Sequence, residues 1–143
     1  MDYKKLAEHF FYKSYQLKKY ELQQIIDENV QGENFALLYI KNKKGCALPG
    51  EISGEMNISS ARVAAILNNL ESKGFIERQI DKTDRRRILV ELTKKGEEKA
   101  ENHNKEVIAK IAKMLELLGE QDAREFVRIT GRIIDLAPAI TAK

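Results

Sequence analysis

The spacing of apolar residues changes at Gly74, and this change is the strongest constraint on the fold. Before Gly74, apolar residues between Val63 and Leu70 recur at the three- and four-residue intervals of one helix face. After it, apolar residues alternate with others from Ile88 to Leu92, which is the two-residue period of a strand. The chain must therefore join a helix to a β-ribbon.

Signals for helix ends divide the region before the ribbon into two helices. Pro49 suits the first turn of a short helix. Asn57 tolerates the left-handed backbone of a tight turn, and Ser59 is a good N-cap for a second helix over Ser60–Lys73. Gly74 stands where a C-cap glycine is expected. This order is typical of a helix-turn-helix.

The ribbon carries its charge at the tip. Phe75 and Ile76 begin one strand, Ile88–Leu92 forms the other, and the charged loop Asp81–Arg87 lies between them. We expect a two-stranded ribbon with an exposed loop. Thr93 then caps a long helix over about residues 94–118.

Helical segments lie on both sides of this unit. Residues 3–28 carry an apolar stripe at helical spacing, and a second helix begins at a cap on Asn34 and ends at Gly45. A last helix begins at Asp122 and is limited by Pro138. The residues expected to face inward from it are Phe126, Ile129, Ile133 and Leu136. The fold class is therefore mainly α with a small β-ribbon.

Positive charge is concentrated in the central unit. Residues 59–95 hold nine basic and five acidic residues, a net charge of +4, whereas the whole chain carries +3. Clustered Lys and Arg favour a double-stranded DNA partner, because its phosphates bind them.

The helix Ser60–Lys73 supplies the first candidates for DNA contact, because the second helix of a helix-turn-helix enters the major groove. The candidates are Ser59, Ser60, Ala61, Arg62, Ala65 and Asn69. Arg62 can read guanine or hold a phosphate, and Asn69 can bond adenine or the backbone. Backbone amides near Ser59 and Ser60 can bind a phosphate.

The arginine run at the ribbon tip supplies the second set. Arg85, Arg86 and Arg87 lie on a narrow loop that can enter a minor groove, and Arg86 is the best single candidate. Arg87 can instead face the ribbon and pair with an acid. Asp84 would repel phosphates unless it orients a neighbouring arginine and caps the tight turn.

Three pieces in order between Pro49 and Gly96 resemble the MarR family of winged helix-turn-helix regulators. They are LESKGFIER, DKTDRRR and LVELTKKG. The flanking helices agree with the family's layout, so the resemblance covers nearly the whole chain. It implies a wing in which Asp84 precedes a minor-groove arginine, Arg86, and a recognition helix over Ser60–Lys73.

The resemblance also implies an organisation and a function. Residues 1–143 would form a single MarR-like domain, with a DNA-binding lobe over 30–95 and homodimerisation helices over about 2–27 and 105–139. Two-fold symmetry would place two recognition helices roughly 10 base pairs apart on a pseudo-palindromic operator. The implied protein is a sequence-specific transcriptional regulator, a ligand-responsive repressor.

Small aromatic effectors often bind the family in a cleft beside the dimerisation helices. Phe11, Tyr12 and Tyr15 are the candidates to line such a cleft, although their helical spacing also suits the core of an interface.

Three departures from the family's pattern are visible. Thr83 replaces an arginine common in the wing, Ala65 replaces a base-contacting polar or basic residue, and Leu48 replaces a capping Ser or Thr. Ala65 and the modest charge of the recognition helix keep open an alternative: a winged-helix protein-interaction module, or an architectural DNA-binding protein with little sequence preference.

Other function classes find little support. Gly45 and Gly50 have the spacing of a phosphate-binding loop, but Glu51 and Ile52 follow them in place of Lys and Ser or Thr. No enzyme and no cofactor are expected. His9 and His103 are isolated, so no metal site is expected either.

Cys46 is the one cysteine, and it can be a redox sensor or a structural residue. The structural role is favoured, because Lys43 and Lys44 would lower its pKa only modestly. A single thiol, no signal-peptide pattern and no run of about 20 apolar residues favour a cytoplasmic protein outside the membrane.

Overall fold

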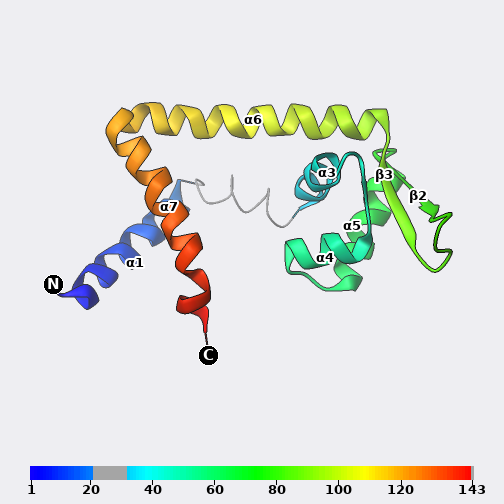
Figure 1. Ribbon diagram of the computed structural model, residues 1–143. Coiled ribbons are helices and arrows are strands. Elements are labelled where there is room, and N and C mark those ends of the chain that lie inside the picture. Colours follow the sequence, from blue (N-terminus) through cyan, green and yellow to red (C-terminus); the bar gives the residue numbers. More distant parts are fainter. Residues whose placement is uncertain (21–31, 143) are drawn as a thin grey trace. The chain divides into compact units, whose positions relative to one another are not determined.

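The computed structural model describes residues 1–20 and 32–142 (Figure 1). Its helices are α1 (Tyr3–Lys19), α3 (Glu33–Asn42), α4 (Pro49–Met56), α5 (Ser60–Ser72), α6 (Lys94–Leu118) and α7 (Glu120–Thr141). Its strands are β1 (Cys46–Ala47), β2 (Ile76–Ile80) and β3 (Ile88–Leu92). The predicted fold class, mainly α with a small β-ribbon, is confirmed. Among the described helices, none is both long and apolar enough to cross a membrane.

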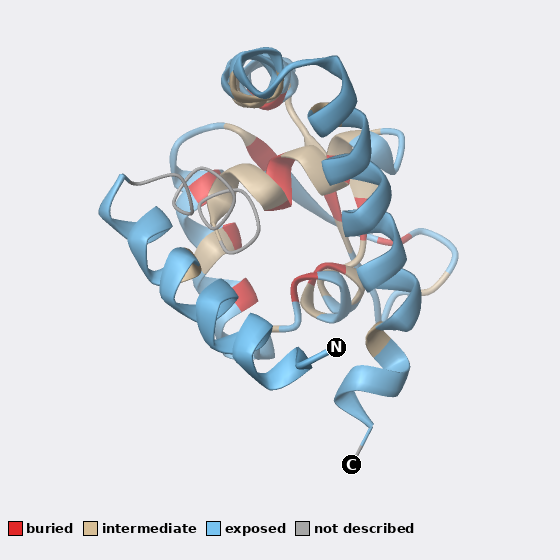
Figure 2. Cartoon of the chain, turned by 90° about the vertical axis from the view of Figure 1, so that its left-hand side faces the viewer, coloured by how far each residue is buried: buried red, intermediate tan, exposed pale blue. Residues whose placement is uncertain are grey.

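The chain divides into two compact units, Met1–Asn104 and Lys105–Lys143, with α6 running through the boundary. The hydrophobic core lies in the first unit, on the segments from α3 to the start of α6. Its largest fully buried side chains are Leu37, Ile40, Ile52, Val63, Leu67, Leu70, Ile76 and Val90. In Figure 2 the buried segments belong to this region, whereas α1 is exposed along its length.

The sheet has three antiparallel strands in the order β1-β3-β2. In the hairpin, Ile76 pairs with Leu92 and Ile80 pairs with Ile88. The prediction of a two-stranded ribbon was therefore incomplete, because Ala47 in β1 also pairs with Val90 in β3. A strand of two residues has no period that a sequence pattern could reveal.

The turns of the helix-turn-helix form as the sequence predicts. Asn57 takes the left-handed conformation, with φ of 54°, and the Ser59 hydroxyl accepts a hydrogen bond from the Arg62 amide at 3.2 Å. Gly74, with φ of +79°, turns the chain from α5 into β2. α5 ends at Ser72, one residue earlier than expected, and Lys73 is its C-cap.

Leu48 is the N-cap of α4, and its side chain makes no capping hydrogen bond because leucine has no acceptor. Glu51 partly replaces it, because its Oε1 accepts a hydrogen bond from the Leu48 amide at 3.3 Å. The Glu51 carboxylate also lies 3.4 Å from Lys43 Nζ. The start of this helix is therefore held by a side chain from inside it, as in half of a capping box.

The junction between the sheet and α6 is closely packed. Thr93 Oγ1 donates to the Gly74 carbonyl at 2.6 Å and accepts from the Gly96 amide at 3.0 Å, so the expected cap at Thr93 is confirmed. Lys95 Nζ donates to the Lys73 carbonyl at 2.9 Å, at the end of α5 where a cation is favourable. A Cβ built on Gly96 would overlap the Phe75 carbonyl.

One expectation about the first two helices is wrong, and part of another falls on residues that the structure does not describe. α3 begins at Glu33 with Gly32 as its N-cap, so Asn34 lies in the first turn and does not cap it. The predicted first helix over residues 3–28 is confirmed to Lys19, and residues 21–28 lie outside the described residues.

The last helix differs from the prediction at both ends. α7 begins at Glu120 after Gly119, not at Asp122, and it continues past Pro138 to Thr141. A proline removes one backbone donor, and here that loss falls in the last turn, where little helix remains to be interrupted. The apolar residues expected to face inward are exposed instead: Phe126, Ile129, Ile133 and Leu136. The described chain offers them no core.

Candidate nucleic-acid interface

The predicted DNA-contacting residues of α5 share an exposed surface. Val63, Leu67 and Leu70 fix the helix against the core. All six candidates are exposed as a result: Ser59, Ser60, Ala61, Arg62, Ala65 and Asn69. A helix with one face buried and a polar, uncovered N-terminal half can present that half to a groove.

The base of the wing, which is the hairpin β2–β3 with its loop 81–87, is anchored by Asp81. Asp81 Oδ1 accepts hydrogen bonds from the Thr83 amide at 2.9 Å and the Thr83 hydroxyl at 2.7 Å. Its Oδ2 lies 3.3 Å from Arg87 Nη2. The Thr83 hydroxyl, then the Thr83 amide, lower the pKa of Asp81, and the Arg87 charge adds to this. Asp81 is only 6% exposed, so the expectation of a wholly exposed loop was wrong at this residue.

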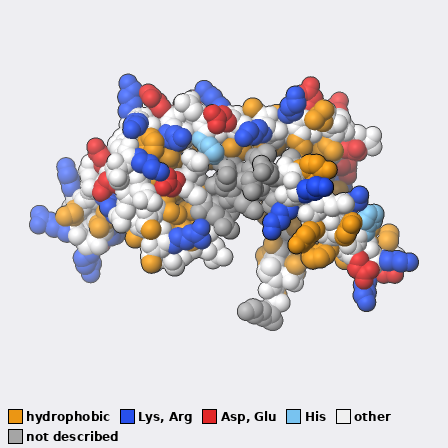
Figure 3. Space-filling model, turned by 180° about the vertical axis from the view of Figure 1, so that it is seen from behind, with side chains coloured by type: hydrophobic (Ala, Val, Ile, Leu, Met, Phe, Trp, Pro, Cys, Tyr) orange, Lys and Arg blue, Asp and Glu red, His pale blue; other side chains and the backbone are white. Residues whose placement is uncertain are grey.

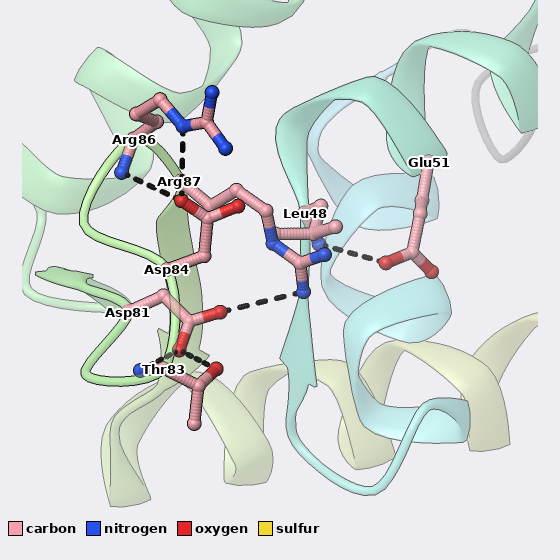
Figure 4. Close-up of polar contacts among 7 residues, drawn as sticks. All are labelled: Leu48, Glu51, Asp81, Thr83, Asp84, Arg86 and Arg87. Carbon is pink, nitrogen blue, oxygen red and sulfur yellow. Dashed lines mark hydrogen bonds and ion pairs between the residues drawn. The ribbon is translucent and has the colours of Figure 1, made fainter.

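The tip of the wing presents Arg86. Asp84 Oδ1 accepts a hydrogen bond from the Arg86 amide at 3.1 Å and another from Arg86 Nε at 3.4 Å (Figure 4). The Arg86 side chain is nevertheless 92% exposed. The expectation that Asp84 orients a neighbouring arginine and caps the turn is therefore confirmed.

The other two arginines of the run have different roles. Arg85 is exposed, whereas Arg87 turns back along the ribbon to Asp81, as the alternative for it anticipated (Figure 4). Lys and Arg side chains project around the wing (Figure 3). The wing thus holds Arg85 and Arg86 outward and uses Arg87 for its own structure.

Sequence reasoning missed a polar group between α5 and β2. Arg78 Nη2 donates to Asn68 Oδ1 at 2.8 Å and to Glu71 Oε1 at 2.9 Å, and Arg78 Nε donates to Glu71 Oε2 at 3.2 Å. The helical period contains part of the signal, because Ala61, Ala65 and Asn68 succeed one another at intervals of four and three residues. The predicted contact, Asn69, is the next residue along α5 and lies outside this row.

Cys46 lies half-buried beside a cavity of about 510 Å³. Burial raises the pKa of its thiol, and the carboxylates of Glu91, Glu51 and Asp81 raise it further. A raised pKa disfavours the reactive thiolate, which supports the structural role. Among the described residues, no group of three or more His, Cys, Asp or Glu is placed to hold a metal ion.

The effector candidates lie on α1. Phe11, Tyr12 and Tyr15 are exposed there, and the neighbouring residues Leu6 and Phe10 are exposed as well. Phe10 lines a shallow hollow on α1 together with Leu6, His9 and Lys13, whereas Phe11, Tyr12 and Tyr15 do not line it.

Comparison with known proteins gives consistent results. The model of the MarR family matches residues 33–88. The HTH-type transcriptional regulator YwhA of Bacillus subtilis is 30% identical over 105 residues, which are 73% of each chain. The HTH-type transcriptional repressor YetL of the same organism is 26% identical over 61% of this chain, and the match spans about half (52%) of YetL's length. Streptococcus pneumoniae FabT, solved in complex with DNA, superposes with a TM-score of 0.73 over 98% of this chain and 100% of FabT, at 22% identity.

Proposed function

This chain belongs to the MarR family of transcriptional regulators, and from that premise we propose that it binds double-stranded DNA at specific sequences and represses transcription by occupying an operator. The observation that carries the proposal is the wing tip, where Asp84 holds the exposed Arg86 in the same compact unit as the uncovered face of α5. FabT, a structural neighbour, was solved with DNA bound.

The roles of the residues follow from their positions. α5 enters the major groove, with Arg62 and the N-terminal amides near Ser59 as its first contacts. Arg86 enters the adjacent minor groove, where the electrostatic potential attracts arginine. Asp84 acts as a positioning residue, because it fixes Arg86 without needing to touch DNA itself.

The functional unit is a homodimer. Residues 30–95 form the DNA-binding lobe, and the helices over about 2–27 and 105–139 form the interface. The exposed apolar residues of α1 and α7 support this, because an apolar face left uncovered in one chain is stabilised by burial against a second copy. Two-fold symmetry then sets two copies of α5 on a pseudo-palindrome, about one helical turn apart.

An effector would act through the same geometry. Binding of a small aromatic molecule near Phe11, Tyr12 and Tyr15 changes the separation of the two recognition helices and weakens DNA binding. No cofactor or metal enters the proposal. The alternative of a protein-interaction or architectural module is less well supported, since the named relatives are called transcriptional regulators.

A gel-shift titration on fragments of the source genome tests the proposal, with Arg86→Ala beside the unaltered protein. We expect discrete shifted bands whose affinity falls with salt and is weakened by about tenfold or more in Arg86→Ala. Binding that ignores salt, or an Arg86→Ala variant that binds as tightly as the unaltered protein, would contradict the wing assignment.

A further inference from the structure

A cluster of three side chains connects α5 to β2. Arg78 on β2 forms a two-point contact with the Glu71 carboxylate and a single contact with Asn68 Oδ1, with both partners on α5. We call Asn68, Glu71 and Arg78 the Arg78 clamp. Two parallel hydrogen bonds between a guanidinium and a carboxylate fix the orientation of the arginine.

The clamp lies between the two elements proposed to contact DNA. Asn68 continues the exposed stripe of Ala61 and Ala65 along α5. Arg78 stands two residues before Ile80, where β2 approaches the wing loop. A duplex held by α5 in its major groove and by Arg86 in the next minor groove must carry one phosphodiester strand across this surface.

The chemistry of the clamp leaves hydrogen-bond donors free. A guanidinium can only donate, so Asn68 Oδ1 is the acceptor and the Asn68 Nδ2 amino group is left over. Within the described part of the chain, neither Asn68 Nδ2 nor Arg78 Nη1 has a hydrogen-bond acceptor. Both groups are pure donors, and phosphate oxygens are pure acceptors.

The same contact disfavours a different role for Asn68, because it fixes the orientation of the amide and uses one of the two lone pairs of Oδ1. An asparagine that reads adenine uses its oxygen and its nitrogen together, one as acceptor and one as donor. Asn68 Oδ1 already accepts a hydrogen bond from Arg78. Asn68 is therefore suited to a phosphate contact, which carries no sequence information.

We propose that Asn68 and Arg78 jointly bind a phosphate group of the DNA strand that crosses between α5 and β2, while Glu71 holds Arg78 in place. This inference rests on the proposed function. Glu71 contributes a negative charge near the strand, and the two-point contact with Arg78 neutralises it. Asn68 and Arg78 are thus binding residues, whereas Glu71 is a positioning residue.

The first test measures fluorescence anisotropy with a mixed-sequence duplex of about 30 base pairs, long enough for two half-sites one helical turn apart. A mixed sequence suffices, because phosphate contacts are independent of sequence. We expect Asn68→Ala to weaken binding about two- to tenfold, as the loss of one hydrogen bond does, without changing the salt dependence.

The matched control is Gln79, an exposed amide on β2 that points to the opposite face from Arg78. Gln79→Ala should bind as the unaltered protein does. Asn68→Asp should bind more weakly than Gln79→Glu, although each adds one negative charge. Equal affinities for Asn68→Ala and Gln79→Ala would overturn the phosphate site.

The second test asks whether Arg78 contacts the DNA directly or only neutralises the charge of Glu71. Arg78→Met removes the donors, and Arg78→Met with Glu71→Gln also removes the carboxylate charge. We expect the double variant to remain several-fold weaker than the unaltered protein. Full recovery would mean that Arg78 only masks Glu71, and it would overturn the direct contact. Circular dichroism and thermal melting confirm that each variant is folded.

Failure of this inference is distinguishable from failure of the proposed function. If the unaltered protein binds neither the mixed-sequence duplex nor any fragment of the source genome, both are wrong. If binding falls in Arg86→Ala but is retained in Asn68→Ala and in the Arg78 variants, the proposed function stands and the phosphate site alone is wrong.

Discussion

Asp84 shows how a residue of unfavourable charge can serve a site that binds an anion. Its carboxylate accepts from the amide and the Nε of Arg86, and the Arg86 guanidinium stays almost wholly exposed. An arginine confined to few conformations loses less entropy on binding than a free one. The gain from positioning can then exceed the repulsion between Asp84 and phosphate.

Replacement of Asp84 by alanine tests this balance. We expect Asp84→Ala to weaken binding to duplex DNA several-fold, although it removes a negative charge, because Arg86 loses both orienting contacts. Glu77→Ala is the matched control, since it removes the same charge from an exposed position on β2. It should leave binding unchanged or slightly stronger. Tighter binding by Asp84→Ala than by Glu77→Ala would show that repulsion dominates.

The contribution of Asp81 to folding stability depends on pH. Hydrogen bonds from Thr83 and the charge of Arg87 hold the pKa of Asp81 below its ordinary value of 3.8. A carboxyl with a lowered pKa stabilises the folded state above its ordinary pKa, and this contribution is lost as the pH falls through the lowered value.

We therefore expect Asp81→Asn to be less stable than the unaltered protein at neutral pH. The difference should shrink as the pH falls from 3.8 through the lowered pKa of Asp81, because below that pKa the carboxyl is protonated and both proteins carry a neutral group at this position. Urea denaturation across this pH range measures the difference directly. If the difference in unfolding free energy between the two proteins stays constant with pH, Asp81 acts through its shape and not through its charge.

At the scale of elements, the junction of β3 and α6 depends on the absence of a side chain at Gly96. The backbone of Gly96 lies against the Phe75 carbonyl, and its amide donates to Thr93. Any Cβ there must displace β2 from α6.

We expect Gly96→Ala to lower the free energy of unfolding by about 1–3 kcal/mol, as overpacking of a close contact does. Gly54→Ala is the control, because a Cβ at Gly54 meets nothing within 4 Å and lies in a helix. It should stabilise the protein by roughly 0.5–1 kcal/mol. Thermal or urea unfolding of both variants gives the comparison, and equal effects would refute the role assigned to Gly96.

The elements predicted well are those with local signals. α5 follows from the Ser59 cap, the apolar stripe and Gly74, and α6 follows from the Thr93 cap. β1 could not be predicted, because two residues have no period. The strand forms by pairing with β3, which is distant in the sequence. The contact of Arg78 with Asn68 was missed for a related reason, since it exists only once β2 folds back beside α5.

The terminal helices carry large apolar residues that are exposed in the described part of the chain. They recur on α7 at helical spacing and include Ile129 and Ile133. Sequence periodicity predicted that these residues face inward, whereas α7 leaves them exposed. It could not distinguish burial inside the chain from burial against a second copy, because both require the same pattern.

Sedimentation equilibrium tests the homodimer. We expect Ile133→Lys to shift the protein from dimer toward monomer, because it places a charge within the apolar face. Asp135→Lys introduces the same side chain two residues away on another face of α7, and it should remain dimeric. A dimer unaffected by Ile133→Lys would exclude this face as the interface.

Whether the recognition helix and the wing read a DNA sequence is measured by the ratio of specific to non-specific affinity. Fragments selected from the source genome supply the specific site, and a scrambled duplex of equal length supplies the reference, both at physiological salt. We expect a ratio of about 10³ or more. A ratio near one would contradict this expectation and would leave a winged-helix module that binds DNA without reading its sequence.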